Sequence, residues 1–384
     1  MGAGIAGASA AYFLAPHARV TLIERESQPG YHTTGRSAAL FAESYGNATV
    51  RAITRASRAF LESPPLRFAA TPLLSPRGHL IFGRADQKQL LEAHAAEMAA
   101  NGGTPRRLAG AEVRALVPAL REDHAHAGVL DAAAEDMDVH ALHQGFLRGA
   151  RAAGAALVTG AELLAAEWTA DRWQVRTSAG EFSASVLVNA AGAWADEVAR
   201  IAGAVPLGIQ PLRRTAIVFE CARFAGSAEQ HARWPMAIDP EETLYFRPEA
   251  GRFLASPADE TPSPPCDAQA EELDVALLID RLQQATQFDV RRITSKWAGL
   301  RSFAPDRTLV TGYDPQRSGF FWLAGQGGYG IQTAPAMGMI AAALVLRREL
   351  PAQVRDQGVE ASALAPGRLE NRGQSPISGA PYSA

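Results

Sequence analysis

The sequence has only two cysteines, Cys221 and Cys266, and they lie outside any CxxC pair. Neither a disulfide framework nor a thiolate zinc site can be built from them, and their scarcity fits a reducing cytoplasm. The chain also has little net charge, with a formal value of -3 over 384 residues. Such a surface offers no basic field to a nucleic acid backbone, so we expect no nucleic acid partner.

Long apolar runs are missing as well. The most apolar stretch, 334–346, contains Pro335 and Gly338 and is shorter than the roughly 20 residues that a membrane span requires. We predict a buried helix here and no transmembrane span. No signal peptide fits before Gly2, so the expected location is cytoplasmic, with peripheral membrane association left open.

The chain opens with Gly2, Gly4 and Gly7 in the spacing G-x-G-x-x-G. A small-residue helix follows, and then a strand, 20–23, that ends at Glu24. In a βαβ unit these glycines allow a tight turn, a close approach to a pyrophosphate, and close packing of helix and strand. The N–H groups at the start of the helix face the anion, and the carboxylate accepts ribose hydroxyls. The motif therefore predicts a Rossmann-like, dinucleotide-binding unit.

The strand that should precede this motif is apparently missing. Only Met1 stands before Gly2, where about five or six apolar residues are expected. In a doubly wound sheet this first strand is central, so its absence leaves unpaired strand edges inside the core. We expect the chain to fold poorly unless another segment fills the gap. A soluble preparation with a cooperative melting transition would contradict this expectation.

The rest of the chain alternates between helical and strand periodicity. Helical spacing predicts helices at 50–61, 87–100, 138–151 and 268–287, and a final helix after Gln332. Alternation predicts strands at 173–177 and 182–188 around the turn Ala179-Gly180, and a separate antiparallel sheet from 207–221, 243–247 and 252–256. The segment 256–267 is rich in proline and acid, so we expect an exposed loop.

A resemblance to a known family enters at Thr34-Gly35-Arg36-Ser37-Ala38-Ala39. Further landmarks are His143-Gln144-Gly145, Asn189-Ala190-Ala191-Gly192-Ala193-Trp194, Trp297-Ala298-Gly299-Leu300-Arg301-Ser302 and Gly325-Gln326-Gly327-Gly328-Tyr329-Gly330-Ile331-Gln332. In this order they resemble the FAD-dependent D-amino acid oxidase and dehydrogenase (DAO) superfamily, most closely its D-arginine dehydrogenase type. They cover most of residues 2–369.

The resemblance implies an α/β plus α+β fold with two domains. A Rossmann-like FAD domain of the glutathione reductase type would combine residues 1–55, 138–205 and 304–370. A substrate domain with a mixed or antiparallel sheet would combine 56–137 and 206–303. The last residues, 371–384, are rich in Gly, Ser and Pro, and we predict a disordered tail.

The resemblance also implies non-covalent FAD. Gly2, Gly4 and Gly7 would hold the pyrophosphate, Glu24 would take the ribose, and backbone N–H groups of 328–333 would stabilise the charge of reduced flavin. The implied cofactor-binding residues are Gly2, Gly4, Ile5, Ala6, Gly7, Glu24, Arg25, Arg36, Ser37, Ala38, Ala191, Gly192, Trp194, Arg301, Gly327, Gly328, Tyr329, Gly330, Ile331, Gln332 and Thr333. No metal is expected, because His140 and His143 lack a third ligand.

The substrate-binding candidates follow from the need to grip a carboxylate. The planar fork of arginine matches a carboxylate with two parallel hydrogen bonds, and Arg301 and Arg214 are the family-matched candidates. Tyr45 and Tyr245 would add hydroxyl contacts, and Gly328 completes the set at the flavin. The sequence does not decide whether Arg214 or its neighbour Arg213 faces inward, and Tyr45 is open to interpretation as an ordinary loop tyrosine.

The sequence departs from the D-arginine type where the substrate side chain should be chosen. His79 stands where that type has an acid, and Leu40 stands where it has a histidine. A neutral or weakly basic His79 cannot pair with a guanidinium as a carboxylate does. Glu43 would restore a negative charge, or it is an exposed loop acid. From these departures we expect a broader or more apolar preference.

The implied reaction is oxidation of a D-amino acid. Hydride would pass from Cα to flavin N5, and the resulting imino acid would hydrolyse to a 2-keto acid and ammonia, with no dedicated protein base. Two alternatives remain open: a glycine or sarcosine type of amine oxidase, and a non-catalytic FAD-binding protein. The electron acceptor, whether oxygen, a quinone or another carrier, also stays open.

Overall fold

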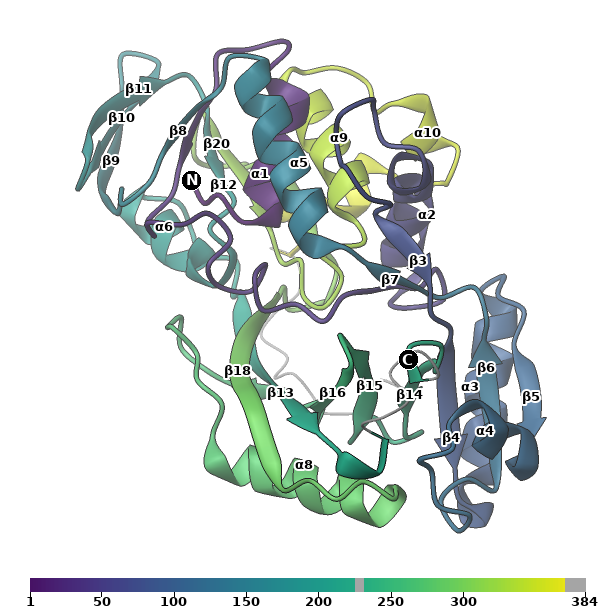
Figure 1. The fold of residues 1–384 in the computed structure, drawn as a ribbon. Coiled ribbons are helices and arrows are strands. Elements are labelled where there is room, and N and C mark those ends of the chain that lie inside the picture. Colours follow the sequence, from purple (N-terminus) through teal and green to yellow (C-terminus); the bar gives the residue numbers. More distant parts are fainter. Residues whose placement is uncertain (225–230, 370–384) are drawn as a thin grey trace.

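The computed structural model describes residues 1–224 and 231–369. They form two halves, seen in Figure 1 as an upper part rich in helices and a lower part dominated by one large sheet. The tail predicted at 371–384 lies outside the described residues.

The upper half contains a largely parallel sheet of Rossmann type, divided into two groups of strands. Its strands are β1 (Thr21–Ile23), β8 (Ala156–Val158), β12 (Leu187–Asn189), β19 (Val310–Tyr313) and β20 (Phe320–Ala324). β1 pairs in parallel with β8, and β12 pairs in parallel with β20, whose other edge carries the antiparallel β19. All five residues of β20 are buried, as expected for a strand that is covered on both faces.

Met1 and Gly2 lie between these two groups of strands. The Gly2 N–H donates to the carbonyl oxygen of Ile23 over 2.8 Å, and the Ala190 N–H donates to that of Met1 over 2.9 Å. The amino group of Met1 donates to the carbonyl oxygen of Val188 over 2.7 Å. The backbone of these two residues thus occupies the position expected for the central strand. Whether the chain as printed folds poorly stays a prediction.

Helices cover this sheet. They are α1 (Ile5–Leu14), α2 (Ala48–Glu62), α5 (Val139–Ala152), α6 (Ala195–Ile201), α9 (Ala334–Val345) and α10 (Ala352–Arg355). α1 packs between α5 and α9 (Figure 1). The predicted buried helix is confirmed at α9, and no helix in the described ranges is long and apolar enough to cross a membrane. The domain boundary predicted at residue 55 falls inside α2, which packs on α9, so we assign the whole of α2 to the upper half.

A small antiparallel sheet extends from one side of the upper half. It consists of β9 (Leu163–Thr169), β10 (Arg172–Thr177) and β11 (Gly180–Ala184). The single strand predicted at 182–188 is wrong, because β11 ends at Ala184 and β12 begins in the other sheet at Leu187. Ser185 and Val186, which separate the two strands, include no glycine or proline, so no strong local signal marks the change of sheet.

The lower half is built on a mixed nine-stranded sheet. Its strands are β4 (His79–Gly83), β5 (Arg106–Ala109), β6 (Ala127–Asp131), β13 (Gln210–Glu220), β14 (Met236–Ile238), β15 (Tyr245–Glu249), β16 (Arg252–Ser256), β17 (Thr261–Pro262) and β18 (Arg292–Phe303). One face carries alternate apolar residues such as Phe219, Phe246 and Phe253, which form a core with α8 (Glu272–Ala285) and α4 (Gly110–Leu116). The opposite face looks toward the upper half.

Shorter elements complete the fold. β2 (Leu40–Phe41), β7 (Glu135–Met137) and β3 (Leu74–Pro76) form a sheet where the halves meet, and α3 (Lys88–Ala100) packs on β6. Single 3-10 turns lie at η1 (Ala85–Gln87), η2 (Gly192–Trp194), η3 (Ala222–Phe224), η4 (Ala361–Ala363) and η5 (Pro366–Leu369). The four internal helices predicted from periodicity are confirmed as α2, α3, α5 and α8.

Candidate functional site

The register of the lower sheet gathers the predicted polar residues on one face. Leu212 of β13 lies opposite Arg301 of β18, so Arg214, two residues further along β13, is the diagonal neighbour of Arg301 on the same face. Tyr245 of β15 lies on this face too, because it stands opposite Ser256 of β16. β14, which pairs with both β15 and β4, continues the face to His79. Four of the predicted substrate residues therefore come from four strands of one surface.

The structure decides which of the two adjacent arginines faces inward. Arg213 points to the α8 side, where it forms ion pairs with Glu271 and with Asp274, the latter over 2.8 Å. Arg214 lines the cavity between the halves. Its Nε donates to the carbonyl oxygen of Asp259 over 2.8 Å. Arg214 is therefore the member of the pair that belongs to the site.

Arg301 is held against the loop from the upper half. Its Nη1 donates to the hydroxyl of Tyr45 over 3.5 Å, and the Tyr45 ring lies 5.0 Å from that of Tyr329. Gly328 lies directly beside the guanidinium, because a Cβ added there would be 3.0 Å from the Arg301 Nη1. The absence of a side chain at Gly328 thus makes room for Arg301.

We expect Gly328→Ala to raise the KM for the substrate roughly tenfold, because the added methyl displaces the Arg301 guanidinium from its alignment. Steady-state kinetics on the single variant and on the Arg301→Ala, Gly328→Ala double variant measure the effect. In the double variant the contribution of Gly328→Ala should vanish. An undiminished effect there would show that Gly328 acts independently of Arg301.

Carboxylates partly balance the positive charge at this end of the cavity. Glu260 forms ion pairs with Arg214 over 3.3 Å and with Arg307 over 2.9 Å. Burial raises the pKa of Glu260, but these arginines and Arg301 lower it more, so it lies below its ordinary value. Burial and the nearby charge of Arg301 lower the pKa of Arg214. Arg301 forms no ion pair within the described residues, which leaves its fork available to an anionic ligand.

A cavity of about 250 Å³ connects the sheet face to the upper half. All six predicted substrate-site residues line it: Tyr45, His79, Arg214, Tyr245, Arg301 and Gly328. On the opposite wall lie the start of α1, the segment 36–40 and the loop 326–332. The cavity thus brings the arginines together with the loops that the sequence assigned to the flavin.

Of the residues considered for the choice of substrate side chain, Leu40 and His79 lie in the cavity and Glu43 does not. Burial lowers the pKa of His79 to about 4, although the Asp131 carboxylate opposes the shift, so the imidazole is neutral at pH 7. Glu43 is not part of the lining and pairs with Arg58. The suggestion that Glu43 restores a charge to the site is therefore not supported.

The loop that carries Tyr45 bonds to the lower half at two points. Beside the Tyr45 contact with Arg301, the Ser44 hydroxyl donates to Asp131 Oδ2 over 3.1 Å. Asp131 stands opposite His79 in the sheet and also accepts from the Ala133 N–H over 3.0 Å. These contacts place Tyr45 at the boundary between the halves.

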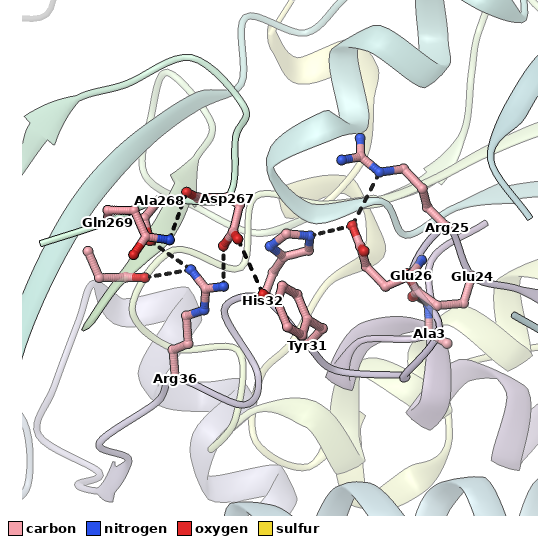
Figure 2. Close-up of polar contacts among 11 residues, drawn as sticks. Ala3, Glu24, Arg25, Glu26, Tyr31, His32, Arg36, Asp267, Ala268 and Gln269 are labelled. Atoms are coloured by element: carbon pink, nitrogen blue, oxygen red, sulfur yellow. Dashed lines mark hydrogen bonds and ion pairs between the residues drawn. The ribbon is translucent and has the colours of Figure 1, made fainter. Parts of the chain in front are cut away.

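A second cavity, of about 180 Å³, runs from the glycine motif along η2. Glu24 lies at its base, where Oε2 accepts the Ala3 N–H over 2.7 Å and Oε1 accepts the Glu26 N–H over 2.9 Å (Figure 2). The Arg25 guanidinium lies 4.7 Å from the centroid of the Trp194 ring. Glu24 thus organises the loop and still has acceptor capacity for a ribose.

Arg36 ties the phosphate-side loop to the lower half. Figure 2 shows its guanidinium directed at Asp267 and at the carbonyl oxygen of Ala268, which it meets over 2.8 Å. It also donates to the carbonyl oxygen of Ala298 over 2.9 Å. Tyr31 reaches the same Asp267 carboxylate over 3.2 Å. Arg36 lines the first cavity, but its donors are largely occupied by these contacts.

Most of the predicted cofactor residues line one of the two cavities. The exceptions are Gly7, Tyr329 and Thr333, which are buried behind the lining. A Cβ at Gly7 would lie 1.9 Å from the carbonyl oxygen of Gly2, so this glycine serves the packing of α1 against the first turn. The Thr333 hydroxyl donates to the carbonyl oxygen of Tyr329 over 2.8 Å and holds the loop before α9.

Sequence reasoning missed several residues of these cavities. Thr33 and Thr34 line both of them, and the Thr34 hydroxyl accepts the Ile5 N–H over 2.9 Å at the start of α1. Three buried atoms along the cavities have no hydrogen-bond partner in the part of the chain that the structure describes: Ser302 Oγ, Gln326 Nε2 and His32 Nδ1. Buried polar atoms of this kind suit a ligand rich in donors and acceptors, so the residues present fit FAD. In the sequence, the motif that begins at Thr34 and the loop before α9 were the signals from which Thr34 and Gln326 could have been found.

Comparison with known proteins decides the family. The model of the FAD dependent oxidoreductase family, DAO, matches residues 1–344. The chain belongs to the DAO family of FAD-dependent oxidoreductases. FAD is therefore its cofactor.

Curated relatives of this DAO family chain match at different lengths. The Bacillus subtilis (strain 168) protein described as uncharacterized oxidoreductase YurR is 26% identical over 378 residues, which cover 91% of this chain and 94% of that protein. The Bos taurus FAD-dependent oxidoreductase domain-containing protein 1 is 25% identical over 178 residues, which cover 42% of this chain and 36% of that protein. The chain thus matches little more than a third of the length of the bovine protein.

Solved structures share the fold of this DAO family chain. L-alpha-glycerophosphate oxidase from Mycoplasma pneumoniae, with FAD bound, has a TM-score of 0.79 at 17% identity, covering 90% of this chain and 93% of that chain. L-proline dehydrogenase from P. horikoshii has a TM-score of 0.77 at 20% identity, covering 96% of both chains. Glycine oxidase from Geobacillus kaustophilus has a TM-score of 0.77 at 21% identity, covering 91% and 94%. The predicted FAD fold with a substrate domain is confirmed.

Proposed function

We propose that this enzyme oxidises free D-amino acids. The observation that carries the proposal is the pair of inward-facing guanidiniums, Arg214 and Arg301, on the wall opposite the flavin loops. An arginine fork without an ion pair in a half-buried cavity suits a carboxylate. The choice of the D enantiomer rests on the resemblance of Tyr45, Arg214, Tyr245 and Arg301 to the D-arginine dehydrogenase type.

The residues of the cavity divide the work as follows. Arg301 binds the substrate carboxylate, with the Tyr45 and Tyr245 hydroxyls beside it, and this grip fixes Cα against the flavin side. FAD supplies the hydride acceptor when bound. The substrate amine loses its proton to solvent, because an imidazole with the lowered pKa of His79, about 4, is a poor base and no protein base is needed. The imino acid then hydrolyses to a 2-keto acid and ammonia.

Names of several structural neighbours support an amino acid as the substrate class. Proline, glycine and iminodiacetate are the substrates in the names of three of them. All three compounds carry a carboxylate next to an amine-bearing carbon, which is the arrangement that Arg301 would grip. The same names include L-proline, so the enantiomer must be tested directly.

Anaerobic reduction of the bound flavin tests this proposal. The FAD-loaded protein is mixed with single D- and L-amino acids, glycine and sarcosine, and the flavin absorbance is followed. We expect bleaching by D-amino acids and a 2-keto acid and ammonia as products. Bleaching by sarcosine or glycine alone would favour the amine oxidase alternative, and no bleaching by any amine would favour a non-catalytic FAD protein.

A further inference from the structure

The substrate cavity continues well beyond the carboxylate clamp. From Tyr245 on β15 it passes β14 and reaches His79 and Ile81 on β4, two strands away. At the usual spacing of about 4.8 Å between strands, this extension is roughly 10 Å long. A small substrate such as glycine does not need this length, whereas a long, unbranched side chain does.

The walls of this extension are mostly apolar. The lining residues there are Leu40, Ile81, Met98, Met236 and Ile238. They come from the upper half, from β4, from α3 and from β14, so they enclose the extension from several sides. Such walls favour an aliphatic stem over a polar one.

The far end of the extension carries negative charge. Glu97 of α3 lines the cavity, and its carboxylate forms no hydrogen bond or ion pair within the described residues. Asp239 also lines the cavity, but its Oδ1 accepts from the N–H groups of Thr243 and Leu244, over 2.7 and 2.6 Å, and its Oδ2 accepts from the Thr243 hydroxyl over 3.0 Å. Glu242 lines the cavity as well, and it is engaged in an interaction of its own. Glu97 is therefore the carboxylate at this end that is available to a ligand.

Charge is thus separated along the cavity. Arg214 and Arg301 stand at one end and Glu97 at the other, with apolar walls between them. The cation that interacts electrostatically with Glu97 is Arg51 of α2. Burial lowers the pKa of Arg51 and the Glu97 carboxylate raises it, but the two side chains form no ion pair in the described ranges. An elongated molecule with a carboxylate at one end and a cation at the other complements this pattern.

We propose that Glu97 binds the end of the substrate side chain and selects D-amino acids with a long aliphatic stem and a terminal positive charge. The inference rests on the proposed function of the same cavity. It replaces the preference for apolar substrates expected from His79, because the acid that balances the cation comes from α3 and not from the His79 position. A partly buried glutamate within a helix gives no such signal in the sequence.

D-lysine and D-norleucine test the assignment, because they share the four-carbon stem and differ in the terminal ammonium. We expect kcat/KM for D-lysine to exceed that for D-norleucine by roughly tenfold, in keeping with one partly exposed charge-assisted hydrogen bond. Glu97→Gln should bring the ratio close to one by lowering the value for D-lysine alone. Glu92→Gln is the matched control, because Glu92 lies on the exposed side of α3 and pairs with Arg107 over 2.8 Å.

The outcomes separate this inference from the proposed function. Equal kcat/KM for the two probes in the unaltered enzyme, or a preference that survives Glu97→Gln, overturns the role of Glu97 while flavin reduction by D-norleucine still upholds D-amino acid oxidation. Flavin that neither probe reduces overturns the proposed function and this assignment with it. A loss of the preference in Glu92→Gln as well would assign the effect to α3 as a whole and overturn the specific role of Glu97.

Discussion

Arg301→Ala is expected to lower kcat/KM for the amino acid by about 10²- to 10³-fold. The change removes the only cation of the clamp that lacks an ion pair within the described residues, and truncating one partner of a buried charge pair costs about 2–5 kcal/mol. The measurement is steady-state kinetics normalised to bound flavin, since Arg301 also borders the cofactor cavity. Arg301→Lys should recover only part of the loss, because an ammonium cannot bind a carboxylate with a planar fork.

Arg213→Ala is the control for this experiment. It removes the same side chain from the same sheet, but on the face that pairs with Glu271 and Asp274. Its effect should fall on stability and leave the KM near that of the unaltered enzyme. If Arg301→Ala keeps kcat/KM within about threefold, the clamp has been assigned to the wrong residue.

Gly7→Ala is expected to abolish FAD binding. The added Cβ would lie 1.9 Å from the carbonyl oxygen of Gly2, and neither backbone can move away without separating α1 from the turn that leads into it. We expect a colourless protein with a free energy of unfolding lower by about 2–4 kcal/mol, in the range of severe overpacking. Flavin absorbance after purification and thermal melting measure the two effects.

Gly367→Ala provides the comparison for Gly7→Ala. A Cβ at Gly367 meets no atom within 4 Å, so the same chemical change should leave colour and melting temperature unaltered. A yellow, fully stable Gly7→Ala protein would show that the close contact of α1 with the first turn is not required.

Part of the site could be predicted from sequence because local motifs report local geometry. The glycine spacing, Glu24 and the Gly328 loop were all singled out from local sequence, and the structure places them along the two cavities. The inward direction of Arg214 could not be predicted, since it depends on the register between β13 and β18. That register is a long-range property, and a shift by one residue would exchange Arg214 for Arg213.

Other features could not be predicted either, because they also depend on contacts between distant parts of the chain. Glu97 enters the cavity only because α3 packs on the far end of the sheet, and Glu43 is removed from it by an ion pair with Arg58. Both are ordinary acids in their local sequence. The separation of β11 from β12 is likewise decided by which sheet offers a partner, since the alternating pattern suits either one.

The short loop with Ser44 and Tyr45 has a thermodynamic consequence. Because it bonds to Asp131 and to Arg301, the clamp is complete only while the upper and lower halves remain docked. A ligand held by that clamp therefore strengthens the docking, and at a concentration of 100 Kd it adds about 2.7 kcal/mol. Affinity for the substrate and resistance of the two-part molecule to heat should rise and fall together.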